Sequence, residues 1–108
     1  MILVVDGNSY ISGKIAEHFF MNGESCCVSQ CNCLECAAIL TAALPFSFVL
    51  MDALTVRFGH DEFIRFRSRN PNTKILVYTT KLSGAEFSVV KDMALKAGAD
   101  FFGDEVQV

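Results

Sequence analysis

Two aspartates and a threonine each stand at the end of a short apolar run in this chain of 108 residues. Asp6 follows "ILVV", Asp52 follows "FSFVLM", and Thr79 closes "KILVYT". Such runs are typical of strands in a parallel sheet, where ligand sites lie at the carboxyl ends of the strands. We therefore expect the three side chains to converge on one site. The alternative for Asp52 alone is a carboxylate that caps the next turn.

The elements that must position these residues alternate along the chain. Strands are expected at Ile2–Val5, Ser25–Ser29, Phe46–Met51, Lys74–Thr79 and Ala99–Gly103. Helices are expected from Asn8 or Ser9 to Asn22-Gly23, from Asn32 through Ala43, over 60–69, and over Ala85–Lys96. Asn32 would cap the second of these helices, with Glu35 three residues on. The last helix would turn its apolar residues inward: Phe87, Val90, Met93 and Ala94. This alternation predicts a single α/β domain, residues 1–108, with a parallel sheet and helices on both faces.

Composition and charge exclude several classes of protein. Hydrophobic residues make up 52% of the chain and charged residues 19%, which favours a packed core over disorder. The net charge is −3, and the short basic run "RFRSR" (65–69) reads as the solvated face of a helix, so no nucleic-acid partner is expected. No apolar run approaches the roughly 18 residues of a membrane span. Because "MILVV" is followed at once by Asp6, it is not a signal peptide, and we expect a cytoplasmic protein.

All of the cysteines lie between positions 26 and 36: Cys26, Cys27, Cys31, Cys33 and Cys36. The high hydrophobic content and the missing signal peptide favour free thiols in a reducing compartment over disulfides. The spacing Cys31-x-Cys33-x-x-Cys36 could in principle hold a soft metal, but His18 and His60 fall in other elements. We therefore favour small apolar thiols on a strand and a helix.

The order of these pieces resembles the receiver domain of bacterial two-component response regulators, the CheY-like domains. "ILVVDGN" looks like the first strand and acidic turn of that family, "FSFVLMD" like its third strand, "KILVYTT" like its fourth, and "ALKAGADFF" like the run into its fifth. The resemblance covers nearly the whole chain. It implies a three-layer flavodoxin-like fold whose five-stranded parallel sheet has the strand order 2-1-3-4-5.

The resemblance also implies a function and a set of roles. Asp52 would be the phosphoacceptor for a histidine kinase in a phosphorelay, which makes the chain a signalling domain and not an enzyme. A Mg²⁺ ion would be held by Asp6, Asp52 and the backbone carbonyl of Leu54. Thr79 would be the switch hydroxyl and Phe102 the aromatic switch residue.

Two residues depart from the family pattern at this site. Gly7 stands where the second acid of the acidic pair is expected, which weakens the Mg²⁺ site by about one formal charge. Glu105 falls at the position of a lysine that contacts the phosphoryl group, and Lys81 could replace that lysine only if its loop folds inward. Impaired phosphorylation is therefore expected. The alternative is a pseudo-receiver that serves as a protein-interaction module without phosphorylation.

Other expectations concern the end of the domain and a third class of function. The helix that follows the fifth strand in receivers is missing from this sequence, so we expect a fragment of a longer protein, or a homodimer or other partner that covers the sheet. A flavodoxin-like enzyme or nucleotide-binding domain is the least favoured hypothesis, because the sequence has no Gly-x-Gly-x-x-Gly or P-loop pattern.

Overall fold

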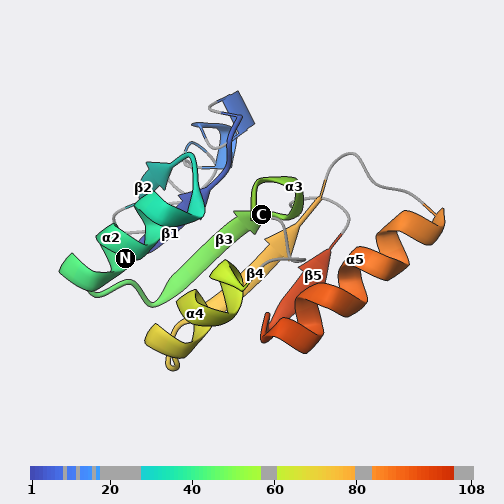
Figure 1. Cartoon of the computed structure of the whole chain (residues 1–108). Helices are drawn as coiled ribbons and strands as arrows, with labels where there is room; N and C mark the ends of the chain where they lie inside the picture. The colour runs from blue at the N-terminus through green and yellow to red at the C-terminus, as the bar shows by residue number, and fades with distance from the viewer. Residues whose placement is uncertain are drawn as a thin grey trace.

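The computed structural model of the chain describes residues 1–8, 10–11, 13–15, 17, 28–56, 61–79 and 84–103. The strands are β1 (Ile2–Val5), β2 (Val28–Cys31), β3 (Phe48–Asp52), β4 (Lys74–Tyr78) and β5 (Phe101–Gly103). The helices are α2 (Leu34–Ala43), α3 (Ala53–Val56), α4 (Glu62–Arg69) and α5 (Gly84–Ala97) (Figure 1). Described residues between 10 and 17 are helical as well.

The strands form one parallel sheet with the order β2-β1-β3-β4-β5. This confirms the predicted α/β class and the strand order 2-1-3-4-5. In the register of the sheet, Val5 lies opposite both Cys31 and Met51, and Asp52 lies opposite Tyr78. The carboxyl ends of β1, β3 and β4 therefore meet at one edge of the sheet, as a common site requires.

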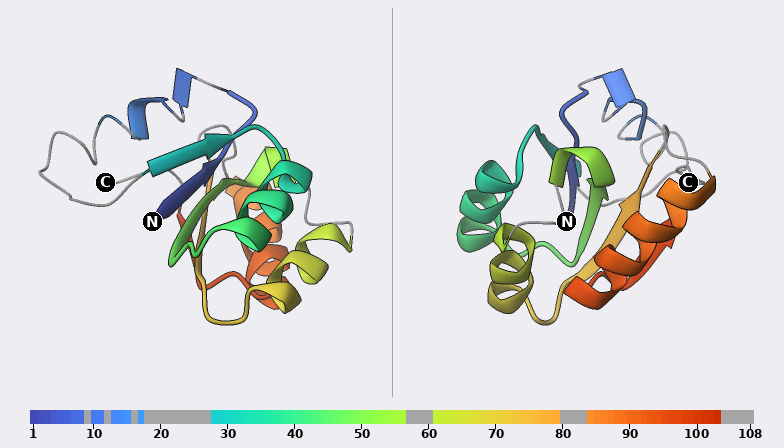
Figure 2. Two further views of the ribbon diagram at one scale, coloured as in Figure 1. Left: turned by 90° about the vertical axis from the view of Figure 1, so that its left-hand side faces the viewer. Right: turned by 45° about the vertical axis from the view of Figure 1, so that its right-hand side comes forward.

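Helices lie on both faces of the sheet. Figure 2 shows α2, α4 and α5 on one face and the helical residues between 10 and 17 on the other. The strands divide their apolar side chains between the two faces because successive residues point in opposite directions. One buried cluster includes Leu3, Val5, Val49, Met51, Ile75 and Val77 with Phe63 and Phe66 of α4, and the other consists of Val4, Ile15, Leu50 and Tyr78.

Several predicted boundaries were wrong. The second strand does not end at Ser29, because β2 pairs with all four residues of β1 and so continues to Cys31; residues 25–27 lie outside the described residues. The cap of the second helix is Cys33 and not Asn32, because the Cys33 sulfur accepts the backbone N–H of Cys36.

Smaller differences occur at the other elements. The third strand begins at Phe48, the fourth ends at Tyr78, the fifth begins at Phe101, and the short helix α3 was not predicted. Met93 does not point inward: it is 38% exposed, because the buried stripe of α5 passes through Val90, Ala94 and Ala97.

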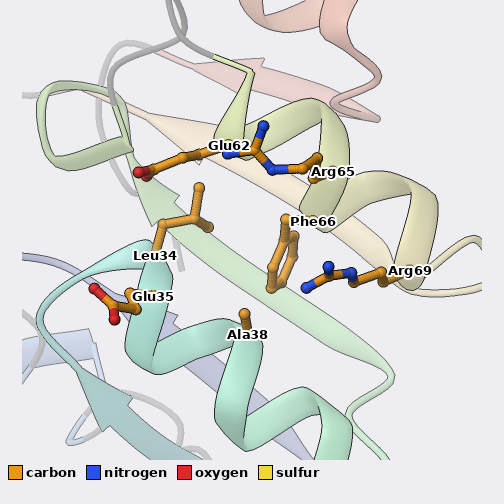
Figure 3. Close-up of a pocket in the computed structure, with 7 residues that line it drawn as sticks. All are labelled: Leu34, Glu35, Ala38, Glu62, Arg65, Phe66 and Arg69. Atoms are coloured by element: carbon orange, nitrogen blue, oxygen red, sulfur yellow. The ribbon is translucent and has the colours of Figure 1, made fainter.

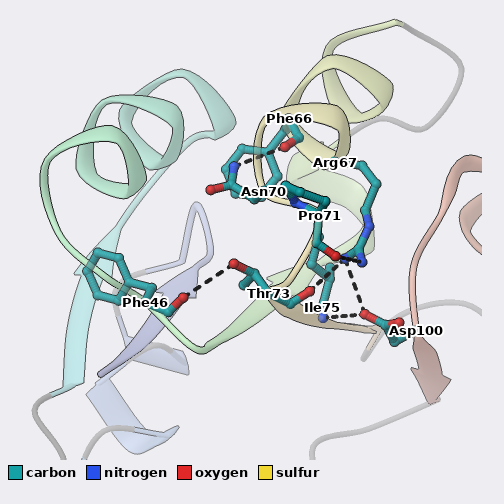
Figure 4. A network of polar contacts seen from close by, with 8 residues as sticks. All are labelled: Phe46, Phe66, Arg67, Asn70, Pro71, Thr73, Ile75 and Asp100. Carbon is teal, nitrogen blue, oxygen red and sulfur yellow. Dashed lines mark hydrogen bonds and ion pairs between the residues drawn. The ribbon is translucent and has the colours of Figure 1, made fainter.

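A polar network ties the entrance of β5 to α4 and β4 (Figure 4). Arg67 Nη1 donates hydrogen bonds to Thr73 O at 2.7 Å and to Asp100 Oδ2 at 3.2 Å, and its Nη2 donates to Pro71 O at 3.1 Å. Asp100 Oδ2 also accepts the backbone N–H of Ile75 at 2.8 Å. The predicted solvated basic face is therefore wrong for Arg67, whose guanidinium is bound within the fold and holds the last strand in register.

Among the residues that the structure describes, no helix is long and apolar enough to cross a membrane.

Candidate functional site

The predicted cluster of polar residues lies at the carboxyl edge of the central strands. Asp52 is the last residue of β3, Asp6 follows the end of β1, and Thr79 follows the end of β4. Asp6 is 5% exposed and Thr79 is fully buried, so both are part of the floor of the site. The backbone N–H of Thr79 donates to Gly103 O at 3.1 Å, which links this edge to β5.

Asp6 is held by hydrogen bonds to both carboxylate oxygens. Its Oδ1 accepts the backbone N–H of Asn8 at 2.8 Å, and its Oδ2 accepts the hydroxyl of Tyr78 at 2.5 Å. Burial is the main cause that raises the pKa of Tyr78 far above its usual value, and the hydrogen bond to Asp6 and the charges of Asp6 and Asp52 add to it. The Tyr78 hydroxyl is therefore a permanent donor to Asp6.

Asp52 caps the short helix that follows it. Its Oδ2 accepts the backbone N–H of Thr55 at 3.1 Å and the Thr55 hydroxyl at 2.7 Å. A carboxylate that accepts the N–H three residues later is a typical N-cap, so the capping role considered for Asp52 is present in the structure. The Thr55 hydroxyl oxygen also accepts the backbone N–H of Gly7 at 3.0 Å, so it bridges the end of β3 to the turn after β1.

The structure brings some of the other predicted site residues to this edge. Leu54 lies in α3 and lines a cavity of about 490 Å³ together with Gly7, Asn32 and Thr55. Phe102 lies in β5 and packs edge to face on Phe87, with ring centroids 5.2 Å apart. Predictions on Glu105 and Lys81 lie outside the described residues, as do those on His18 and His60.

The donor set at this edge fits a hard divalent cation with few protein ligands. The carboxylates of Asp6 and Asp52 are oxygen ligands of the kind that Mg²⁺ prefers, the predicted backbone carbonyl of Leu54 would be a third, and Mg²⁺ commonly keeps several waters. Gly7 adds no side-chain ligand. Over the described part of the chain, no group of three or more His, Cys, Asp or Glu side chains gathers to hold a metal, which also leaves Cys31, Cys33 and Cys36 without support as a metal site.

A second cavity of about 200 Å³ lies between α2 and α4, away from the Asp52 carboxylate (Figure 3). Leu34, Ala38 and Phe66 line its apolar part, and Arg65 and Arg69 extend from α4 beside it. Glu35 and Glu62 border both cavities. The smaller cavity thus has an apolar lining with both acidic and basic side chains at its edge, and none of the predicted site residues lines it.

Sequence reasoning missed Thr55 and Tyr78, which contact the two carboxylates. A hydroxyl residue three positions after Asp52 is a signal for a capped helical turn, and it could have identified Thr55. Tyr78 was treated only as an apolar strand residue. Its hydroxyl needs a partner when the ring is buried, and that requirement alone indicated a nearby acceptor.

Comparisons with known proteins place the fold. A scan of protein-family models and a search of curated proteins both found no match. Solved structures match over nearly the whole chain. A response regulator protein from Burkholderia pseudomallei, described with a phosphorylated aspartic acid, a calcium ion and citrate, has a TM-score of 0.81 and 23% identity, and the match covers 99% of this chain and 60% of that one.

Two further structures agree. The chemotaxis protein CheY4 from Vibrio cholerae has a TM-score of 0.75 and 19% identity over 96% of this chain and 84% of its own. The beryllofluoride-activated NtrC4 receiver domain, described as a dimer, has a TM-score of 0.75 and 20% identity over 99% of this chain and 85% of its own. The chain thus has the CheY-like fold of receiver domains, and it spans 60% of the length of the Burkholderia protein.

Proposed function

We propose that this chain is a receiver-type signalling domain whose Asp52 accepts a phosphoryl group from a histidine kinase. The observation that carries the proposal is the position of Asp52 at the end of the central strand, with Asp6 and Thr79 at the ends of the two flanking strands. In this proposal the domain relays a signal in a two-component pathway and is not an enzyme.

The chemistry requires an oxygen of Asp52 to attack phosphorus. The new P–O bond forms as the P–N bond to the donor histidine breaks, and the imidazole nitrogen keeps the bonding electrons and takes up a proton from solvent. Among the described residues, the hydrogen bonds to Asp52 go to Oδ2. We therefore assign the attack to Oδ1, while the hydrogen bonds from Thr55 to Oδ2 lower the nucleophilicity of the carboxylate.

Charge is the main obstacle to this reaction. A carboxylate must approach an anionic donor beside a second, buried carboxylate, Asp6. Mg²⁺ held by Asp6, Asp52 and the carbonyl of Leu54 would supply positive charge. With Gly7 in place of an acid, the cation would be held less tightly. Glu105, predicted at the lysine position, would add repulsion of up to roughly 4 kcal/mol for two unit charges about 4 Å apart. We propose that phosphorylation is slow for these reasons.

The response to phosphorylation would pass through Thr79 and β5. The product carries about −1.5 to −2 charge, by analogy with other phosphorylated side chains, and a hydroxyl at Thr79 could donate to it. The backbone N–H of Thr79 donates a hydrogen bond to the carbonyl of Gly103, and Phe102, which precedes Gly103, packs on Phe87 of α5. A shift of Thr79 would therefore change the surface formed by α5 and β5, where we propose that a partner binds.

A pseudo-receiver is the second candidate, and a specific observation favours it. Asp6 and Asp52 are already bound by the hydroxyls of Tyr78 and Thr55. These neutral donors each bind one oxygen of a carboxylate that a cation would otherwise bind. If they suffice, the domain would act by binding other proteins and would not respond to phosphoryl donors.

The proposal extends to the organisation of the domain. Phe101 of β5 is 53% exposed, although its register partner Leu76 is partly buried and packs against the second core cluster. This exposure supports a further helix over that part of the sheet, supplied by a longer form of the protein or by a second copy. A cytoplasmic location stays a prediction of the sequence.

Acetyl phosphate with Mg²⁺ tests the proposed function. Intact mass spectrometry of the treated chain should show the gain of one phosphoryl group, and the gain should be lost in Asp52→Ala. The matched control is Asp92→Ala, which removes an exposed aspartate of α5 and should leave the gain unchanged. No mass gain, together with no Mg²⁺-dependent change in stability, would replace the receiver proposal with the pseudo-receiver.

A further inference from the structure

Cys33 and Cys36 form a dithiol at the first turn of α2. Cys33 is the N-cap of the helix, and its sulfur accepts the backbone N–H of Cys36 at 3.4 Å. The two residues are thus a Cys-x-x-Cys pair at a helix N-terminus, and the sulfur of the first contacts the backbone of the second.

Both thiols can be reached from solvent. Cys36 is exposed, and Cys33 is half-buried and lines the cavity of about 490 Å³ beside Gly7 and Thr55. Cys31, the third thiol in this part of the chain, is half-buried on β2, and its own sulfur contacts the carbonyl of Cys33 at 3.7 Å. Among the cysteines that the structure describes, access and contact therefore single out the pair Cys33 and Cys36.

The helix assigns different roles to the two sulfurs. The Cys33 sulfur lies at the N-terminus of α2, where the helix dipole is positive, and it accepts the backbone N–H of Cys36. The pKa of Cys36 is raised, first by a side-chain hydrogen bond with Cys33, then by the charge of Cys33, by desolvation and by the charge of Glu35. Cys33 is therefore the attacking sulfur, and Cys36 is the one that follows.

We propose that Cys33 and Cys36 are a redox-active dithiol that closes to a disulfide by exchange with a small-molecule disulfide such as oxidised glutathione. The Cys33 thiolate attacks one sulfur of the reagent, which forms a mixed disulfide and releases one thiolate. The Cys36 thiolate then attacks the Cys33 sulfur, the bond to the reagent breaks, and a second thiolate leaves. Two cysteine thiols are oxidised, one disulfide is reduced to two thiols, and the two cysteine protons pass to the leaving thiolates.

This site is separate from the phosphoacceptor but borders it. The backbone N–H of Asp6 donates to the carbonyl of Cys31 at 3.0 Å, and Asn32, which precedes Cys33, lines the same cavity as Gly7. A disulfide would thus form at the rim of the carboxylate site. The inference does not depend on phosphorylation of Asp52, and its test uses no phosphoryl donor.

Treatment of the reduced, unaltered chain with oxidised glutathione is the first test. We expect the loss of two hydrogen masses, and alkylation of the remaining thiols followed by peptide mapping should place the bridge between Cys33 and Cys36. The chain with Cys31→Ser serves as the matched control and should form the same bridge. A bridge that includes Cys31, a bridge between two chains, or no bridge would each overturn the proposal.

Single substitutions test the order of attack. Cys36→Ser should accumulate a mixed disulfide of glutathione on Cys33, because the second thiol is missing. Cys33→Ser should accumulate at least several-fold less on Cys36 over the same time, because Cys36 is not the N-cap of α2 and its pKa is raised. Circular dichroism checks that each variant folds. Equal accumulation in the two folded variants would contradict the assigned roles.

Discussion

The hydroxyl of Tyr78 donates a hydrogen bond to Oδ2 of Asp6, although β3 lies between their two strands in the sheet. The ring of Tyr78 is buried beside Leu50, and its hydroxyl reaches across the end of β3 to the carboxylate. Asp6 thereby accepts a hydrogen bond from a neutral donor, whereas the proposed phosphorylation needs Asp6 to bind a cation. The balance between this donor and Mg²⁺ is the physical difference between the two proposed functions.

Tyr78→Phe should lower the stability of the chain and strengthen its response to Mg²⁺. The loss of the donor leaves a buried carboxylate oxygen without its partner, which costs about 1–3 kcal/mol of unfolding free energy. Asp6 then depends more on a cation, so Mg²⁺ should raise the unfolding free energy of the variant by more than that of the wild type. Urea denaturation with and without Mg²⁺ measures both effects.

Tyr10→Phe is the matched control for that substitution. It removes the same hydroxyl from a side chain that is 67% exposed and belongs to the helical residues between 10 and 17. The unfolding free energy should stay within about 0.5 kcal/mol of the wild type, as is usual for surface changes. An equal Mg²⁺ response in both tyrosine variants would show that the Tyr78 hydroxyl does not compete with a cation.

Gly7→Asp should restore a tighter Mg²⁺ site. A Cβ at Gly7 would lie 3.4 Å from Thr55 Oγ1 and 3.9 Å from Asn32 O, which are ordinary contacts, so the side chain fits. The third carboxylate should destabilise the chain without divalent ions, through repulsion with Asp6 and Asp52, and tighten Mg²⁺ binding by about tenfold or more. Isothermal titration and denaturation measure the two effects.

Gly13→Asp adds the same charge where a Cβ meets nothing within 4 Å, in the helical region before β2. The affinity for Mg²⁺ should not change in this control. If Gly13→Asp and Gly7→Asp tighten Mg²⁺ binding equally, the gain is a general effect of net charge, and position 7 has no part in a metal site.

Thr55→Val should make Asp52 more reactive and the chain less stable. The substitution keeps the shape of the side chain but removes the donor to Asp52 Oδ2 and the acceptor for the N–H of Gly7. We expect a loss of about 1–2 kcal/mol of unfolding free energy and a several-fold faster mass gain with acetyl phosphate, because a carboxylate that loses a donor is a stronger nucleophile.

Thr41→Val is the control for Thr55→Val. Its hydroxyl donates to Ala38 O at 3.3 Å within α2, so a helical contact is lost without any change at Asp52. The rate of labelling should equal that of the wild type. A slower rate in Thr55→Val would instead mean that the hydroxyl holds Asp52 in its reactive orientation.

The fold was predictable because local patterns and tertiary structure agree. Continuous apolar runs such as Ile2–Val5 became central strands, and the alternation with helices left few possible topologies. The strand order came from the family resemblance, since the spacing of the runs does not fix it. Boundaries failed where long-range contacts decide them: β2 follows the length of β1, and the stripe of α5 follows the surface on which it packs.

The candidate site was only partly predictable. Strand ends identified Asp6, Asp52 and Thr79, because a parallel sheet brings its carboxyl ends together. The contacts that tune the two carboxylates were not predictable in the same way. Tyr78 reaches Asp6 from 72 residues away, and the bridge from Thr55 to Gly7 spans 48 residues. Such pairs depend on the final packing of side chains, which periodicity does not report.

The thiol of Cys31 should make the stability of the chain depend on alkaline pH. Burial is the main cause that raises its pKa from 9.0 to about 11. The folded state therefore binds this proton more tightly than the unfolded state, so the stabilisation is complete below pH 9.0 and is lost as the pH rises through about 11. Because the thiol is half exposed, solvent screening reduces the effect, and we expect a loss of about 1 kcal/mol of unfolding free energy. Urea denaturation across this pH range should show that the unfolding free energy of the wild type falls by that amount relative to that of Cys31→Ala. Below pH 9.0 the difference between the two chains should be constant. A difference that stays constant up to about pH 11 would mean that the Cys31 thiol ionises as readily in the folded chain as in the unfolded one.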